Sequence, residues 1–214
     1  MLPMKRFLLL IFMLLSFQLQ AQLAIKVLHF NPTGDQGLLF EKRFTGELMY
    51  MGELLEDNNY IRFRAGTSIV PLKSRLDTFP SYILENGEVK PGYKIYEQYD
   101  MGFFFGGMEW ACIHPEPFYA YFGGDIILGG ILVNSKTHYE STYAEEADDS
   151  FKGGHPMFGF RYRAGVQYKF FKEHGVFAEF SQAFYGVFHA NHGVMEKGVQ
   201  SHYDIGVGIQ FVFD

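Results

Sequence analysis

Charged side chains recur at every second position in several stretches of the chain. Arginine, lysine, aspartate and glutamate in such a pattern can form ion pairs. Both signs of charge occur among them. A buried charge is tolerated when it is paired, so we expect an ion-pair network inside the fold. A selective aqueous pore would need a wider interior or one dominant sign of charge. The predicted network consists of Arg43, Glu47, Arg62, Arg64, Asp125, Arg161, Arg163, Lys169, Glu179 and Asp204.

Histidines offer a second kind of chemistry, because imidazole nitrogens bind Zn²⁺ and related ions. Several histidines are expected near one rim of the fold, beside the acidic stretch at 145–149. That stretch lacks the spacing of an EF-hand calcium loop. We therefore expect a solvated rim and no cofactor, with metal binding as the weaker alternative. The rim candidates are His138, His155, His189, His192 and His202.

A hydrolase acting on lipid A or phospholipid is the enzymatic alternative. Ser201 precedes His202, and the run from His138 to Ser141 includes Glu140, so the residue types of a nucleophile, a base and an acid are present. Neighbouring residues of a strand point to opposite faces, which works against a hydrogen bond between Ser201 and His202. We therefore expect that the protein is not an enzyme.

The elements that position these residues are β-strands. From 202 to 213 every odd position is a large apolar residue, and the even positions are polar or glycine except Val212. Residues 156–171 alternate as clearly, and strict alternation indicates a strand with two different faces. The chain contains about eight such stretches. In 93–112, Asp100 and Glu109 fall on opposite parities, and a β-bulge near 102–107 is predicted to reconcile them.

The connections between the predicted strands alternate between long and short. An even number of strands with every second connection tight is typical of small membrane barrels. Tight turns rich in turn-forming residues are predicted at 56–59, 113–117 and 172–175, and long exposed loops at 73–92 and 139–155.

Composition and the N-terminal stretch narrow the class of protein. The chain has 214 residues, enough for one domain, and its 24 glycines and 18% aromatic residues favour strands over a helical bundle. Residues 1–21 have the charged, apolar and polar segments of a secretory signal, so we predict cleavage after Ala21 and a barrel over 22–214. Cys112 is the single cysteine, which excludes an internal disulfide. A net charge of −6 argues against nucleic acid as a partner.

The chain resembles the eight-stranded outer-membrane barrels of the OmpA/OmpX type. The end of its export signal, Leu19-Gln20-Ala21-Gln22, is similar to that of outer-membrane proteins of the Bacteroidota. The resemblance rests on the architecture and on Gly208-x-x-Phe211-x-Phe213 near the C-terminus. It implies an all-β, antiparallel, up-and-down transmembrane β-barrel in a bacterial outer membrane, with both termini in the periplasm. It further implies contact with membrane lipid and lipopolysaccharide, and recognition of Gly208, Phe211 and Phe213 by the barrel-assembly machinery. Asp214 after the last aromatic residue, and the lack of a following peptidoglycan-binding domain, depart from the pattern.

Alternation alone also fits a periplasmic ligand-binding barrel that keeps its apolar face inward. Strands long enough to cross a bilayer, and aromatic residues near their ends, favour the membrane barrel. In it, Asp204 is expected to pair with Arg161 or Arg163, and Gly206 and Gly208 leave room for bulky neighbours. The expected function is a plugged barrel that displays its loops for structural or interaction roles. It would act alone, beside other outer-membrane proteins, or as an accessory subunit of a larger complex for secretion, assembly or import.

Overall fold

The computed structural model describes residues 21–53, 61–85, 88–113, 117–139, 147–170, 174–188 and 199–213. The signal segment and the three predicted tight turns lie mostly outside these ranges. The signal cleavage and the turns therefore remain predictions. The elements are β1 (Ala21–Thr33), α2 (Gly34–Leu39), β2 (Arg43–Glu53), β3 (Ile61–Pro71), β4 (Phe79–Glu85), β5 (Glu88–Ile113), β6 (Phe118–Tyr139), β7 (Ala147–Lys169), β8 (Gly175–Val187) and β9 (Val199–Phe213).

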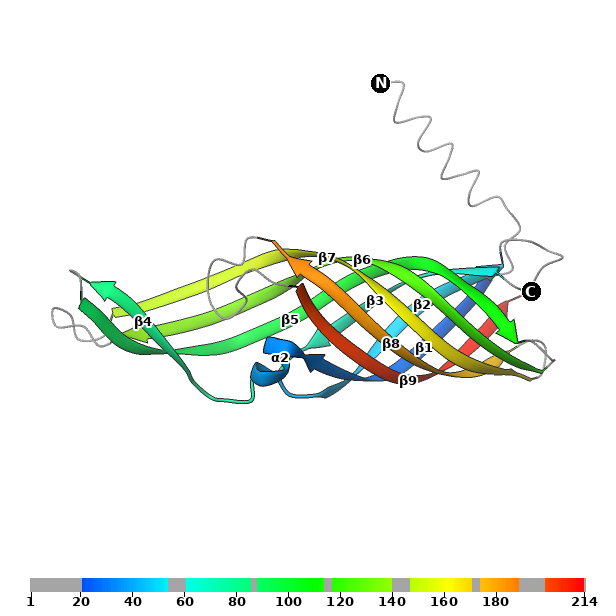
Figure 1. Cartoon of the computed structure of the whole chain (residues 1–214), viewed down its shortest axis with the longest axis horizontal. Helices are drawn as coiled ribbons and strands as arrows, with labels where there is room; N and C mark the ends of the chain where they lie inside the picture. Colours follow the sequence, from blue (N-terminus) through cyan, green and yellow to red (C-terminus); the bar gives the residue numbers. More distant parts are fainter. Residues whose placement is uncertain are drawn as a thin grey trace, which may run out of the picture.

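The strands close into a barrel (Figure 1). Each strand pairs antiparallel with its neighbours, β1 pairs with both β2 and β9, and β3 pairs with β5. The ring therefore runs β1, β2, β3, β5, β6, β7, β8, β9 and back to β1, while β4 lies outside it as an additional strand on β5. The predicted all-β fold with about eight antiparallel strands is confirmed. Within the described part of the chain, no helix is long and apolar enough to cross a membrane.

The two faces of the barrel wall differ in polarity because successive side chains of a strand point to opposite sides. Outward side chains are large and apolar: Phe104 is 69% exposed and Val207 is 63% exposed. Inward side chains include Arg161 at 0% and Glu179 at 3% exposure. The alternative of a soluble barrel with an apolar interior is wrong, since the apolar belt lies outside and the charges lie inside.

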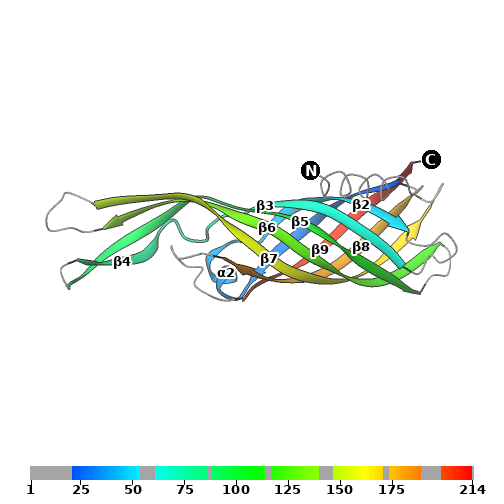
Figure 2. The same ribbon diagram turned by 90° about the horizontal axis from the view of Figure 1, so that it is seen from above.

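Three strands continue well past the ring. A membrane strand needs about 9 to 11 residues, whereas β5, β6 and β7 have 26, 22 and 23. Pairing between β7 and β8 begins at Met157, so residues 147–155 pair with β6 alone. Together with β4 they form a four-stranded sheet that projects from one end of the barrel (Figures 1 and 2). We call this sheet, made of residues 79–85, 88–98, 131–139 and 147–155, the extension.

The extension corrects the prediction of two long irregular loops. Within 73–92, Phe79–Glu85 pairs with residues 88–94 as a hairpin. Within 139–155, β7 begins at Ala147, and only 140–146 lie outside the described residues. Prolines and charges in these segments indicated loops, but both residue types also occur in strands at the edge of a sheet.

The predicted bulge in β5 is also misplaced. Residues 102–107 pair without interruption with β6, and the register shifts lie at Tyr96/Gln98 and Ala111/Ile113. Glu109 faces the interior, while Asp100 is half-buried on the other face, at the level where β5 leaves the ring. Asp100 and Glu109 therefore do lie on opposite faces of β5, and no bulge between them is needed.

Candidate functional site: the charged interior of the barrel

Asp125 on β6 is the centre of the charged network inside the barrel. Its carboxylate accepts hydrogen bonds from three guanidinium groups: Arg64 at 3.0 Å, Arg161 at 3.0 Å and Arg163 at 3.1 Å. The strand register brings it there, because Asp125 stands opposite Arg161 across the β6–β7 pair. On its other side stands Gly107, where an added Cβ would lie 2.7 Å from the Asp125 carboxylate. A glycine at this position therefore leaves room for the central carboxylate.

A second carboxylate pair extends the network across the lumen. Lys26 on β1 contacts Glu47 at 2.6 Å and Glu179 at 2.9 Å. Glu47 also binds Arg161 at 2.5 Å, and Glu179 binds Arg64 at 2.7 Å. Two of the arginines on Asp125 thus each hold a second carboxylate, and Lys26 joins those two carboxylates. The interior is therefore one connected set of charges and not a series of separate pairs.

Glu109 on β5 completes the network on the side of β3. It pairs with Arg62 at 2.5 Å, the residue opposite it in the β3–β5 register, and with Arg163 at 2.5 Å. Arg62 also donates to the side-chain oxygen of Gln167 at 2.8 Å. Arg163 is consequently shared between Glu109 and the central Asp125.

Aromatic rings line the same layer. The Phe105 ring lies 4.3 Å from the guanidinium carbon of Arg161 and 5.4 Å from that of Arg64. Tyr121 receives Arg62 over its ring at 5.5 Å and donates its hydroxyl to Glu179 at 3.1 Å. Cations over aromatic faces are attracted by the ring quadrupole, more strongly when water is excluded. These rings therefore add favourable contacts for the arginines and fill the space between the ion pairs.

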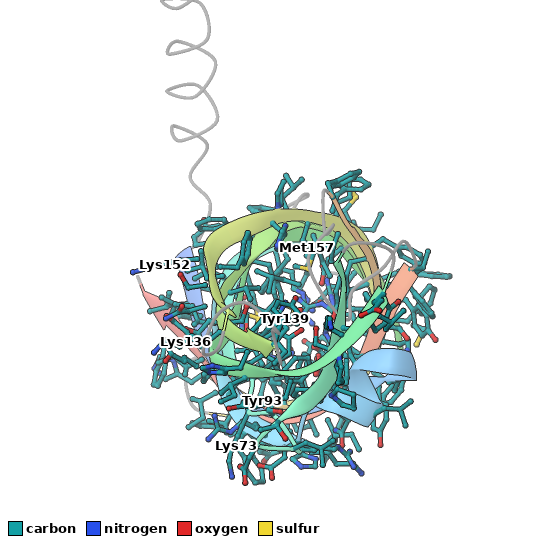
Figure 3. All side chains as sticks on the ribbon, turned by 90° about the vertical axis from the view of Figure 1, so that its left-hand side faces the viewer. Lys73, Tyr93, Lys136, Tyr139, Lys152 and Met157 are labelled. Carbon is teal, nitrogen blue, oxygen red and sulfur yellow. The ribbon has the colours of Figure 1, made fainter. Side chains whose placement is uncertain are left out.

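The buried charges inside the barrel are balanced in number. In the described part of the barrel interior, five basic and five acidic side chains are buried: Lys26, Arg62, Arg64, Arg161, Arg163, Glu47, Glu109, Asp125, Glu179 and Asp204. Such balance suits a filled interior better than an ion-selective path, which wants one dominant sign. The view from the extension end shows side chains projecting into the ring (Figure 3).

Uncharged layers close the network at both ends. Towards β8's start, Gln167 donates to Gln210 at 2.6 Å, and Gln210 donates to Gln22. Towards the extension, Phe40 is 1% exposed and packs on the ring of Tyr99 at 4.4 Å, as part of an apolar cluster that also includes Leu28, Phe30, Val70, Met101, Ile127 and Ile131. Helix α2 folds over this end, where its Gln36 accepts a hydrogen bond from the hydroxyl of Tyr185.

The structure places seven of the ten predicted network residues together and leaves Arg43, Lys169 and Asp204 outside the ion-pair network. Arg43 is half-buried at the extension end, where it donates to the carbonyl of Pro71. Lys169 is half-buried at the opposite end, with its ammonium 4.6 Å from the ring of Tyr119. Both lie on the lumen side of their strands, but their positions at the strand ends keep them outside the ion-pair network.

Sequence reasoning missed Lys26 and Glu109. The inward neighbours of Lys26 are Ala24 and Leu28, so both faces of that segment are apolar and alternation gives no signal. Glu109 shares its inner face with Phe103 and Phe105, which resemble outward residues. The usable signal for Glu109 was its register opposite Arg62, which becomes apparent only once β3 and β5 are known to pair.

Asp204 and His202 correct two further expectations. Asp204 is buried, but its contacts are Ser181 at 3.1 Å and His202 at 3.5 Å, not the expected Arg161 or Arg163. The arginines are instead held by Asp125, Glu47 and Glu109. His202 is not a rim residue: it is 1% exposed and lies against the rings of Phe30 at 4.4 Å and Tyr185 at 5.5 Å.

The other histidines that the structure describes do not converge on a metal site. His138 lies against Tyr93 at 4.8 Å, and His155 stacks on Phe151 at 5.5 Å within the extension. His189 and His192 lie outside the described residues. In the ranges that the structure does describe, no group of three or more His, Cys, Asp or Glu side chains could hold a metal ion.

Near the C-terminus, Gly208 faces the lumen and Phe211 faces outward. An added Cβ on Gly208 would lie 2.3 Å from the ring of Phe177, so that ring occupies the space the glycine leaves. Gly206 similarly lies beneath the side chain of Lys26. The strand continues to Phe213, whose side chain lies outside the described part.

Ser201 and His202 lie on opposite faces of β9. The hydroxyl of Ser201 is 2.6 Å from that of Thr33, whereas the ring of His202 is inside the barrel. The two side chains are therefore not arranged as a nucleophile and its base. Glu140 and Ser141 of the other candidate run lie outside the described residues.

Comparisons with known proteins support the fold. No protein-family model and no curated protein sequence matches the chain. Among solved structures, neisserial surface protein A (NspA) aligns with a TM-score of 0.57 at 13% identity, over 91% of this chain and 97% of that one. The chain has the fold of an eight-stranded outer-membrane barrel. Ail of Yersinia pestis (TM-score 0.41, 16% identity, 89% and 97% covered) and a major outer membrane protein of Thermus thermophilus (0.45, 10%, 89% and 99%) align less well.

Proposed function

We propose that the protein is a closed, non-enzymatic barrel of the outer membrane that holds the extension above the membrane as a binding surface for another macromolecule. The observation that carries the proposal is the continuation of three wall strands into a sheet with open edges. Support for the membrane location comes from the outward apolar belt and from the likeness of fold described above. In this orientation, both termini and the short turns lie in the periplasm, and the outer wall contacts phospholipid and lipopolysaccharide.

The extension has two edges available for strand addition. In the described residues β4 pairs only with β5, and residues 147–155 of β7 pair only with β6. An edge strand presents unpaired backbone N–H and C=O groups, and an extended segment of a partner can complete them by β-augmentation. Tyr82 on β4 is 76% exposed and would contact such a partner.

The filled interior supports a display role over transport. The charged network and the apolar cluster above it occupy the lumen, and an eight-stranded barrel is only wide enough for its own side chains. The non-enzymatic proposal rests on the separation of Ser201 and His202 by the barrel wall.

Site-specific photocrosslinking in living cells tests the proposal. A benzoylphenylalanine at position 82 should give adducts with a protein partner, whereas the same probe at Phe104, which is 69% exposed on the outer belt, should give lipid adducts. A secretion, assembly or import complex would be identified at this step if the barrel is its accessory subunit.

Shortening the hairpin at residues 79–94 to a tight turn provides the matched control. The shortened barrel no longer contains position 82, so the partner is followed by affinity purification from native membranes. The shortened barrel should still reach the outer membrane and still migrate differently on gels before and after heating, while the partner that crosslinks to the full chain is no longer recovered. Unfolding of the shortened protein, or absence of any protein adduct at position 82 in native membranes, would contradict display by the extension.

A further inference from the structure

The outer wall of the barrel has two adjoining hollows at the end opposite the extension. One, of about 670 Å³, lies over β1 and β6 to β9, and the other, of about 590 Å³, lies over β5 to β9. They share Val166 and Ala178, so they form one continuous depression, which we call the outer-wall trough. Its lining is almost wholly hydrocarbon, and Figures 1 and 2 show its strands side by side.

The trough exists because three adjacent strands carry alanine at outward positions. These are Ala120 on β6, Ala164 on β7 and Ala178 on β8. The register sets them diagonally: Val166 stands opposite Ala120 on one side and Ala178 on the other. Aromatic side chains border this floor on outward positions of the surrounding strands: Phe118, Phe122, Tyr168, Phe180 and Phe211. The result is a shallow floor of small residues between aromatic walls.

The chemistry of the lining selects the occupant. A depression in the apolar belt is covered by hydrocarbon when the barrel spans a membrane, and an apolar lining offers no partner for a headgroup. A second copy meeting the same patch about a twofold axis would set hollow against hollow and leave a void without contacts. A flexible acyl chain can follow a curved floor, whereas another rigid wall cannot.

We infer that the outer-wall trough is a binding site for one acyl chain of a phospholipid. The inference rests on the proposed membrane location: the trough lies at the short-turn end, which faces the periplasmic leaflet, where phospholipid supplies the chains. A chain lying on this floor of small residues would contact both the floor and the aromatic side chains that border it.

Native mass spectrometry of the full barrel released from outer membranes in mild detergent tests the site. The wild-type protein should retain one phospholipid per chain. Ala178→Phe places a ring on the floor shared by both hollows and should lower the lipid-bound fraction about tenfold. Ala65→Phe, the same change on the exposed outer face of β3, which does not line the trough, should leave the fraction unchanged.

Four outcomes would overturn the inference: no retained lipid, retained lipopolysaccharide in place of phospholipid, a dimer in place of the lipid adduct, or equal loss in the two variants. Outer-membrane fractionation and heat-dependent gel migration of the same samples report separately on the proposed location. A barrel that fractionates with the outer membrane but retains no lipid therefore counts against the trough alone.

Discussion

Replacing Asp125 with Asn should strongly destabilise the barrel. The change preserves shape but removes the one carboxylate shared by Arg64, Arg161 and Arg163. Each arginine keeps another acidic partner, Glu179, Glu47 and Glu109 respectively. The loss is therefore that of a single uncompensated buried charge, about 3–5 kcal/mol of unfolding free energy, and not three times that value.

Urea unfolding in lipid vesicles, followed by heat-dependent gel migration and by fluorescence of the single tryptophan, Trp110, measures this loss. The control is Glu97→Gln, which removes a carboxylate 2.6 Å from Lys136 in the extension, where both side chains are well exposed. Exposed ion pairs contribute up to about 1 kcal/mol. If Asp125→Asn costs no more than this control, the network is not a coupled buried structure and the argument from its geometry is wrong.

The remaining predictions concern assembly, packing and metal binding. Gly208→Val should cost about 1–3 kcal/mol, because its Cβ meets the ring of Phe177; Gly102→Val, where an added Cβ meets nothing within 4 Å, should cost less in the same urea assay. Phe211→Ala combined with Phe213→Ala should lower the amount of folded barrel in outer membranes, measured by heat-dependent gel migration, and normal levels would count against a role in assembly. Calorimetry with Zn²⁺ in detergent should show no saturable binding, because the described histidines lie in separate contacts.

The fold was predictable from the sequence because the barrel obeys a two-residue period over most of its wall. Alternation assigned Arg62, Arg64, Arg161, Arg163 and Glu179 to the inner face, since their outward neighbours are uniformly apolar. Which charge meets which could not be predicted. Those contacts join strands far apart in the sequence, so they depend on the register and closure of the ring.

The errors lie where one face stops being uniform. Near the extension the lumen is filled by apolar side chains, so inward and outward residues become alike, the sequence leaves the phase of β5 open, and the bulge predicted near 102–107 is misplaced. His202 is predicted at the rim because alternation becomes clear only from 202, whereas β9 begins at Val199 and the ring of His202 lies on the inner face. The sequence predicts loops in place of the extension because its strands do not separate an apolar outer face from a polar lumen. Without those two different faces, their residues show no regular alternation of polarity.

The continuity of β5, β6 and β7 from the barrel wall into the extension has a mechanical consequence. The hydrogen bonds of an antiparallel pair lie perpendicular to the strands. A pull on the tip of the extension acts along the strands, so it shears many of these bonds at once and does not peel them apart one after another. Tension applied to the extension is thus passed straight into the barrel wall, with no flexible joint among the described residues of these three strands.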